Sequence, residues 1–129
     1  MIHRIIAIAV FTGGFTALAA ALLLAGCAQH KAPKPLTVAE IPAALNQAFA
    51  QAPTERKELV DRTVSTLQAG EIAKALMVVE GLCAVPDLTK EQRETASRAL
   101  LTLTQELQAA AQRGDKAAAD FQRLRQSTR

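Results

Sequence analysis

Residues 89–113, TKEQRETASRALLTLTQELQAAAQR, decide the fold, because they carry the longest helical pattern in the chain. Thr89 and Gln92 stand at the spacing of a capping box, which closes the first turn of a helix. Apolar residues then recur at alternating intervals of four and three, which places them on one helical face: Ala96, Leu100, Leu103, Leu107 and Ala110. Gly114 follows as a stop signal. The sequence therefore predicts one helix from Thr89 to about Arg113.

Four shorter helices are expected around this one, each bounded by proline, glycine or a capping residue. They cover about 37–52, 54–69 and 71–84, and a last stretch that begins at Asp115. Thr37 and Glu40 form a second capping-box spacing, and Pro42 suits the first turn that follows. Thr54 is placed to cap the second helix.

Each of these helices has an apolar face that predicts what it buries. The inward residues are expected to be Leu59, Val60, Thr63, Val64 and Leu67, then Ile72, Leu76, Val79 and Cys83, and finally Ala117, Phe121 and Leu124. No alternating run of β-branched residues follows the N-terminal segment. Residues 37–129 are thus expected to form an all-α domain, either a small antiparallel helical bundle or an array of helical hairpins.

Residues 70–76, GEIAKAL, resemble the second helix of a tetratricopeptide repeat, in which Gly and an acidic residue precede Lys-Ala-Leu. A similar Gly-acid pair opens the Ala-rich residues 114–119, 44 positions later. The resemblance implies stacked helical hairpins in which the small Ala75 allows close packing. The repeat period is usually about 34, so generic antiparallel hairpins remain the alternative.

The first 26 residues have the pattern of a secretory signal peptide. Arg4 lies in a short basic start, and residues 5–25 carry no charge. The segment ends in Leu22-Leu23-Leu24-Ala25-Gly26-Cys27, which resembles the lipobox of bacterial lipoproteins. The resemblance implies cleavage after Gly26, a diacylglyceryl thioether on Cys27 and often a further acyl chain, such as palmitate, on the new amine. The alternative is an uncleaved transmembrane anchor, for which about 20 apolar residues suffice.

Residues 27–36 are expected to be a lipidated cysteine followed by a tether. Pro33 and Pro35 favour an extended backbone, while Lys31 and Lys34 either touch anionic headgroups or remain solvated. The lipoprotein resemblance also implies in which membrane the protein is placed. Position 28 is Ala, whereas Asp at this position is the family's signal for retention in the inner membrane. We therefore expect a membrane-bound protein that faces away from the cytoplasm, at the periplasmic leaflet of the outer membrane where two membranes exist.

The mature chain offers little for chemistry. His30 is its only histidine and lies in the tether, so no Ser-His or Cys-His pair is expected in the helical domain, nor any metal or cofactor site. Cys83 is interpreted as a small buried hydrophobe, with an intermolecular disulfide as the alternative. The net charge is +3, but the charges are mixed in sign and Trp and Tyr are absent, which argues against a nucleic-acid partner.

Two classes of function follow. The favoured class is a non-catalytic, lipid-anchored helical module that binds an envelope protein or helps envelope assembly. The alternative class is a small envelope hydrolase or a peptidoglycan-acting enzyme, for which the sequence shows no catalytic residues.

Overall fold

The structure, a computed structural model, describes residues 34–128. Over these residues the fold is all-α, as predicted. The helices are α2 (Ile41–Ala48), α3 (Thr54–Gln68), α4 (Ile72–Cys83), α5 (Lys90–Gln112) and α6 (Lys116–Ser127). The signal segment, Gly26, Cys27 and most of the expected tether lie outside the described residues. Between residues 34 and 128, no helix combines the length and hydropathy needed to cross a bilayer.

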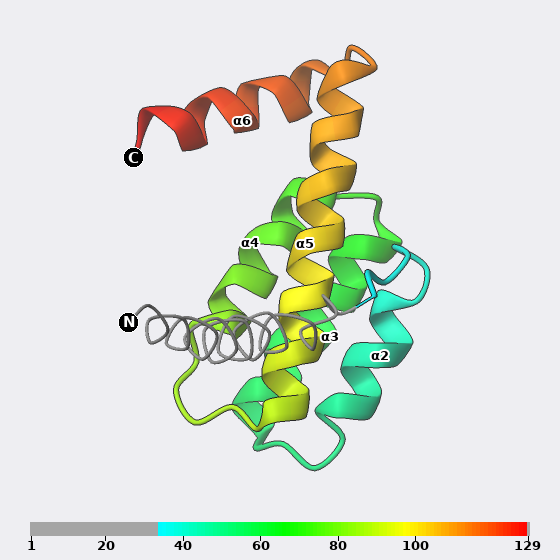
Figure 1. Ribbon diagram of the computed structural model, residues 1–129, viewed down its shortest axis with the longest axis vertical. Coiled ribbons are helices and arrows are strands. Elements are labelled where there is room, and N and C mark those ends of the chain that lie inside the picture. Colours follow the sequence, from blue (N-terminus) through cyan, green and yellow to red (C-terminus); the bar gives the residue numbers. More distant parts are fainter. Residues whose placement is uncertain (1–33, 129) are drawn as a thin grey trace, which may run out of the picture. The chain divides into compact units, whose positions relative to one another are not determined.

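Helices α2 to α5 form a four-helix bundle in which successive helices run in opposite directions (Figure 1). Helix α2 packs against both α3 and α5, while α4 packs against α3 and α5, so the four helices close into a ring. Short connections make this antiparallel order the expected one. The apolar faces meet inside, where the fully buried residues include Ile41, Leu45, Leu76, Val79, Leu82, Ala96, Ala99 and Leu103.

Helix α5 confirms the prediction made for it. The Thr89 hydroxyl accepts from the Gln92 N–H at 3.1 Å, and the Gln92 side chain accepts from the Thr89 N–H at 3.2 Å, which completes the capping box. Leu103 is fully buried, whereas Leu100 is half-buried. Ala99 and Thr102 are buried as well, because α5 contacts helices on more than one side. Gly114 adopts the positive φ of 93° that a helix-terminating glycine allows.

The start of the first helix differs from the prediction. Both the N–H and the hydroxyl of Thr37 donate to the Glu40 carboxylate at 2.8 Å, which lowers the pKa of Glu40 and forms a turn before the helix. Helix α2 begins only at Ile41 because Thr37 lies too far upstream to reach the amides of its first turn. Pro42 occupies that turn as expected. The helix ends at Ala48 rather than near Ala52.

The expected cap of α3 is also wrong by one residue. Pro53 is the N-cap, and its carbonyl accepts from the N–H groups of Arg56 and Lys57 at 3.0 and 3.2 Å. Thr54 is the first helical residue, and its side chain makes no capping hydrogen bond. The physical reason is that proline has a fixed φ and can take the extended conformation required of an N-cap, which leaves Thr54 free to begin the helix.

The N-termini of α5 and α3 give a matched test of capping, because a threonine caps α5 and none caps α3. We expect Thr89→Ala to lower the free energy of unfolding by about 1 kcal/mol, because it removes a hydroxyl that satisfies an N-terminal amide of α5. Thr54→Ala removes the same atoms where no cap bond exists and should change stability by less than about 0.5 kcal/mol. Urea unfolding of both variants checks this, and equal effects would contradict the assignment of the caps.

Helix α6 buries a different face from the one predicted. Ala118 is the buried residue, while Ala117 is exposed and Leu124 is 66% exposed. Phe121 is half-buried as part of the observed inward face. Asp115 does cap the helix, since its carboxylate accepts from the Ala118 N–H at 3.1 Å. Helix α6 follows the turn at Gly114 and Asp115 and runs across the end of the bundle instead of entering the ring (Figure 1).

Candidate functional site

The candidate site is a shallow groove of about 400 Å³ between α3 and α4, here called the α3/α4 groove. Helix α3 contributes Leu59, Arg62 and Thr66. Helix α4 contributes Lys74, Met77, Val78 and Gly81. The side chain of Met77 is 50% exposed, so an apolar floor lies open to solvent. An exposed apolar surface between two helices is a suitable place for another molecule to dock.

The apolar periodicity of α4 does not predict this groove, although the sequence carries another signal for it. Helix α4, IAKALMVVEGLC, has only two charged residues, Lys74 and Glu80, and has apolar residues around most of its circumference. Leu76 and Val79 fill the core side, so Met77 and Val78 are left on the outer side. A helix that is apolar nearly all round is expected to be covered on more than one face.

The charged residues that line the groove are both basic. The Lys74 ammonium forms an ion pair with Glu71 at 2.6 Å, and both side chains are exposed to solvent. The Arg62 guanidinium has no ion-pair partner among residues 34–128. The hydroxyl of Thr66 donates to the carbonyls of Arg62 and Thr63, so this hydroxyl is already used within α3. Arg62 is therefore the free charge at the rim of the groove.

Gly81 leaves the α4 side of the groove open. A Cβ atom placed on this residue would meet nothing within 4 Å, and its backbone does not adopt a positive φ. Neither close packing nor backbone conformation within the described domain requires glycine here. Glycine in a helix costs about 0.5–1 kcal/mol relative to alanine. The residue thus exposes helix backbone at the groove without a structural need.

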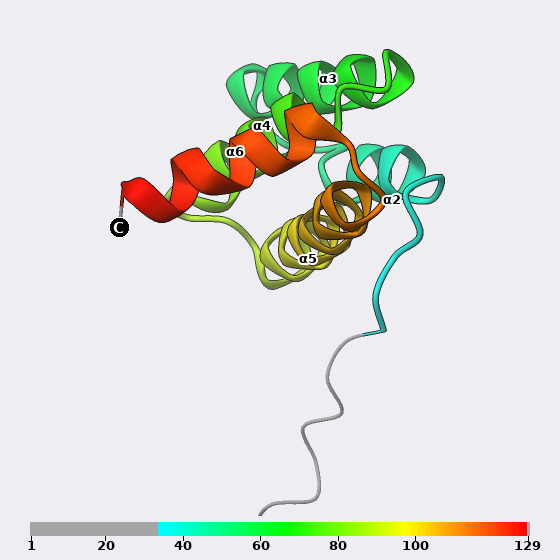
Figure 2. The same cartoon turned by 90° about the horizontal axis from the view of Figure 1, so that it is seen from above.

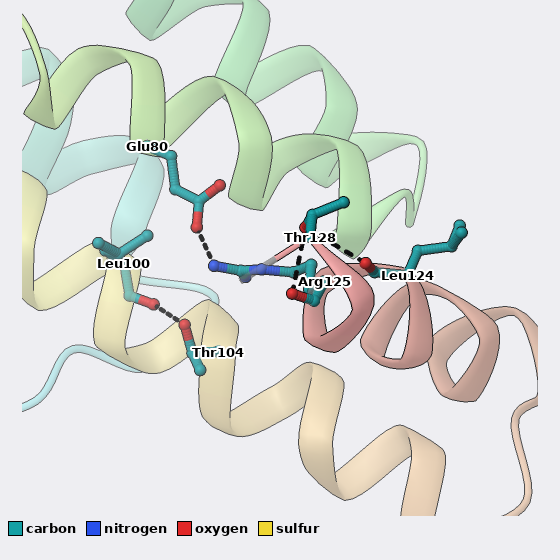
Figure 3. Close-up of polar contacts among 6 residues, drawn as sticks. All are labelled: Glu80, Leu100, Thr104, Leu124, Arg125 and Thr128. Carbon is teal, nitrogen blue, oxygen red and sulfur yellow. Dashed lines mark hydrogen bonds and ion pairs between the residues drawn. The ribbon is translucent and has the colours of Figure 1, made fainter.

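A second hollow, of about 170 Å³, lies where α6 meets α5, and it is a structural junction. The Arg125 guanidinium forms an ion pair with Glu80 of α4, as Figure 3 shows. Arg125 also lies over the Phe121 ring, 5.8 Å from its centroid. The charges of the pair are more than one-third exposed, so each contact contributes about 1 kcal/mol or less. These contacts hold α6 in place and leave no free charge for a ligand.

The reactive side chains that the sequence offers are not brought together in the described residues. Cys83 is half-buried rather than buried, because it lies at the edge of the core at the end of α4. Burial, and then the Glu80 charge, raise the pKa of its thiol above the ordinary value. Residues 34–128 contain no group of three or more potential metal ligands. Cys27 and His30 lie outside the described part of the chain.

The end of the expected tether is held against the domain. The hydroxyl of Thr102 donates to the Leu36 carbonyl, and the Arg98 side chain donates to the Lys34 carbonyl, both at 2.6 Å. Residues 34–36 therefore lie on α5. Figure 2 shows α5 and α3 on opposite sides of the bundle, so these residues do not cover the α3/α4 groove.

Comparison with known proteins adds no family: no protein-family model, no curated protein and no solved structure matches this chain. The resemblances to the lipobox and to the tetratricopeptide repeat therefore stay predictions.

Proposed function

We propose that this protein is a lipid-anchored lipoprotein of the cell envelope whose helical domain is a non-catalytic module for protein–protein interaction or envelope assembly. The observation that carries the proposal is Leu24-Ala25-Gly26-Cys27 at the end of an uncharged segment. The Cys27 thiol is the nucleophile that a lipid-derived group requires. Two or three acyl chains, at about 0.8 kcal/mol per buried methylene, would hold the protein firmly in a membrane.

The α3/α4 groove and the charge distribution support the binding part of the proposal. All twelve acidic residues of the chain lie within 34–128, where they are balanced by twelve Lys and Arg residues. The excess of positive charge comes from Arg4, Lys31 and Arg129, outside this range. A neutral domain without Trp or Tyr suits a protein partner better than a nucleic acid.

Anchoring is tested at Cys27. We expect Cys27→Ala to abolish metabolic labelling by a fatty-acid analogue and to leave a precursor of higher mass, because the acceptor thiol is gone. Cys83→Ala, which removes the other cysteine of the chain, should be labelled and processed normally. A Cys27→Ala protein that is labelled and processed like the wild type would overturn the lipoprotein assignment.

The interaction part has its own test. After detergent extraction of membranes, the tagged wild-type protein should co-purify with one envelope protein in a constant ratio. Recovery of the chain alone, at detergent concentrations that preserve other envelope complexes, would contradict a role in protein binding.

A further inference from the structure

We propose that the α3/α4 groove binds a single amphipathic helix of a partner protein. In this arrangement a small residue of the partner helix lies over Gly81, and its acidic side chains lie beside Arg62 and Lys74. The inference rests on the proposed function, since it assigns the chemistry of the partner at a surface of the same module.

The backbone around the groove favours a helix over an extended peptide. Residues that line the groove belong to α3 and α4, whose interior N–H and C=O groups bond within their own helices. An extended segment would need main-chain partners that this surface lacks. A helix satisfies its own backbone and presents only side chains, so apolar residues at i, i+3 and i+4 can cover Leu59, Met77 and Val78.

Gly81 allows a close approach. The open space above it means that a partner helix meets bare backbone on the α4 side of the groove. Small residues at helix contacts let two backbones come near each other, and glycine does so at a cost to the helix that carries it. A contact made by another helix gives this glycine a role that the isolated domain does not.

The basic residues at the groove favour a partner helix that carries negative charge. Arg62 is unpaired among the described residues, and Lys74 has only an exposed partner, so both are available to carboxylates. An anionic membrane surface is disfavoured as the occupant because two basic residues supply only about 1 kcal/mol each and the domain has no net charge. Acidic residues that flank the apolar stripe of the partner helix fit both features.

The test uses the full chain purified in detergent and two fluorescent peptides. One is an amphipathic helix of about 18 residues, with Leu and Ala on one face and Glu at its edges. The other has Lys in place of every Glu. We expect the acidic peptide to bind at least about tenfold more tightly by fluorescence anisotropy, with an affinity that falls as salt is raised.

Two variants identify the groove. Gly81→Leu fills the open space with a good helix former and should weaken binding of the acidic peptide at least about tenfold while the helical content is kept. Arg62→Glu should reverse the preference between the two peptides. The matched control is Lys57→Glu, which makes the same kind of charge change at an exposed position of α3 that does not line the groove. This variant should bind both peptides like the wild type.

Several results would overturn the proposal. These are equal binding of both peptides, binding of neither, or unchanged affinity in Gly81→Leu. If the wild-type chain self-associates and Gly81→Leu abolishes this self-association, the occupant of the groove would be a second copy of the chain. If the fragment from Ala28 onward binds phosphatidylglycerol vesicles and Arg62→Glu abolishes that binding, the occupant of the groove would be a membrane surface.

The failure of this proposal can be distinguished from failure of the proposed function. If an envelope protein co-purifies equally well with wild type and Gly81→Leu, the interaction module stands and the groove is wrong. If the peptide results hold but Cys27 is not acylated, the groove stands and the lipid anchor is wrong.

Discussion

Replacing Phe49 with alanine is expected to lower the free energy of unfolding by about 3–5 kcal/mol, a large share of the 5–15 kcal/mol typical of a domain. Phe49 is 1% exposed and is the largest fully buried side chain of the described residues. It follows the last residue of α2, where its ring enters the core between helices. Alanine would remove most of that volume and leave a cavity that rigid neighbouring helices cannot fully close.

The measurement is urea unfolding of the fragment from Ala28 onward, monitored by circular dichroism. Phe121→Ala is the matched control, because the same side chain is only half-buried on α6, outside the four-helix ring. Its effect should be clearly smaller than that of Phe49→Ala. Equal losses at the two positions would mean that α6 belongs to the cooperative core as fully as α2.

Leu103→Ala is the second large effect, at about 2–5 kcal/mol. Leu103 is completely buried in the middle of α5. Its neighbour Leu101 is 46% exposed, so Leu101→Ala removes the same atoms from a surface position and should cost less than about 1 kcal/mol. The two melting temperatures, measured side by side, separate the buried face of α5 from its outer face.

Partner binding should be insensitive to Leu103 except through loss of folding. Sequence periodicity alone leaves open whether the stripe on α5 is core or docking surface, and the complete burial of Leu103 assigns it to the core. A folded Leu103→Ala protein that keeps wild-type stability but loses its partner would reverse that assignment. The apolar surface that lines the α3/α4 groove includes Met77, which is half-exposed.

Much of the fold could be predicted because its signals are local. The capping box at Thr89 and Gln92 depends on residues within one turn, and both hydrogen bonds are present. The stops at Gly70 and Gly114 reflect a backbone conformation that glycine adopts without strain, and both residues have positive φ. The error at Thr54 arose because Pro53 is the N-cap of α3, and the error at Thr37 arose because its side chain bonds to Glu40 in a turn before α2.

The periodicity of one helix face did not predict the candidate site. Met77 and Val78 were left unassigned because the periodic stripe of α4 accounts only for the residues that face inward. Whether the outer residues of α4 are covered depends on where α3 lies beside it. The sequence likewise does not predict a role for Gly81, because that role depends on the open space next to its backbone.

By itself, the sequence determined that the described chain is helical, where its longest helix begins and ends, and which residues share a face. These features follow from hydrogen bonds and side-chain spacing within a few turns. Only the tertiary structure decided that α6 buries Ala118 instead of Ala117 and Leu124, that Phe49 enters the core, and that the α3/α4 groove is open. Periodicity places residues on a common face, but burial of that face depends on helices distant in sequence and on how closely they approach.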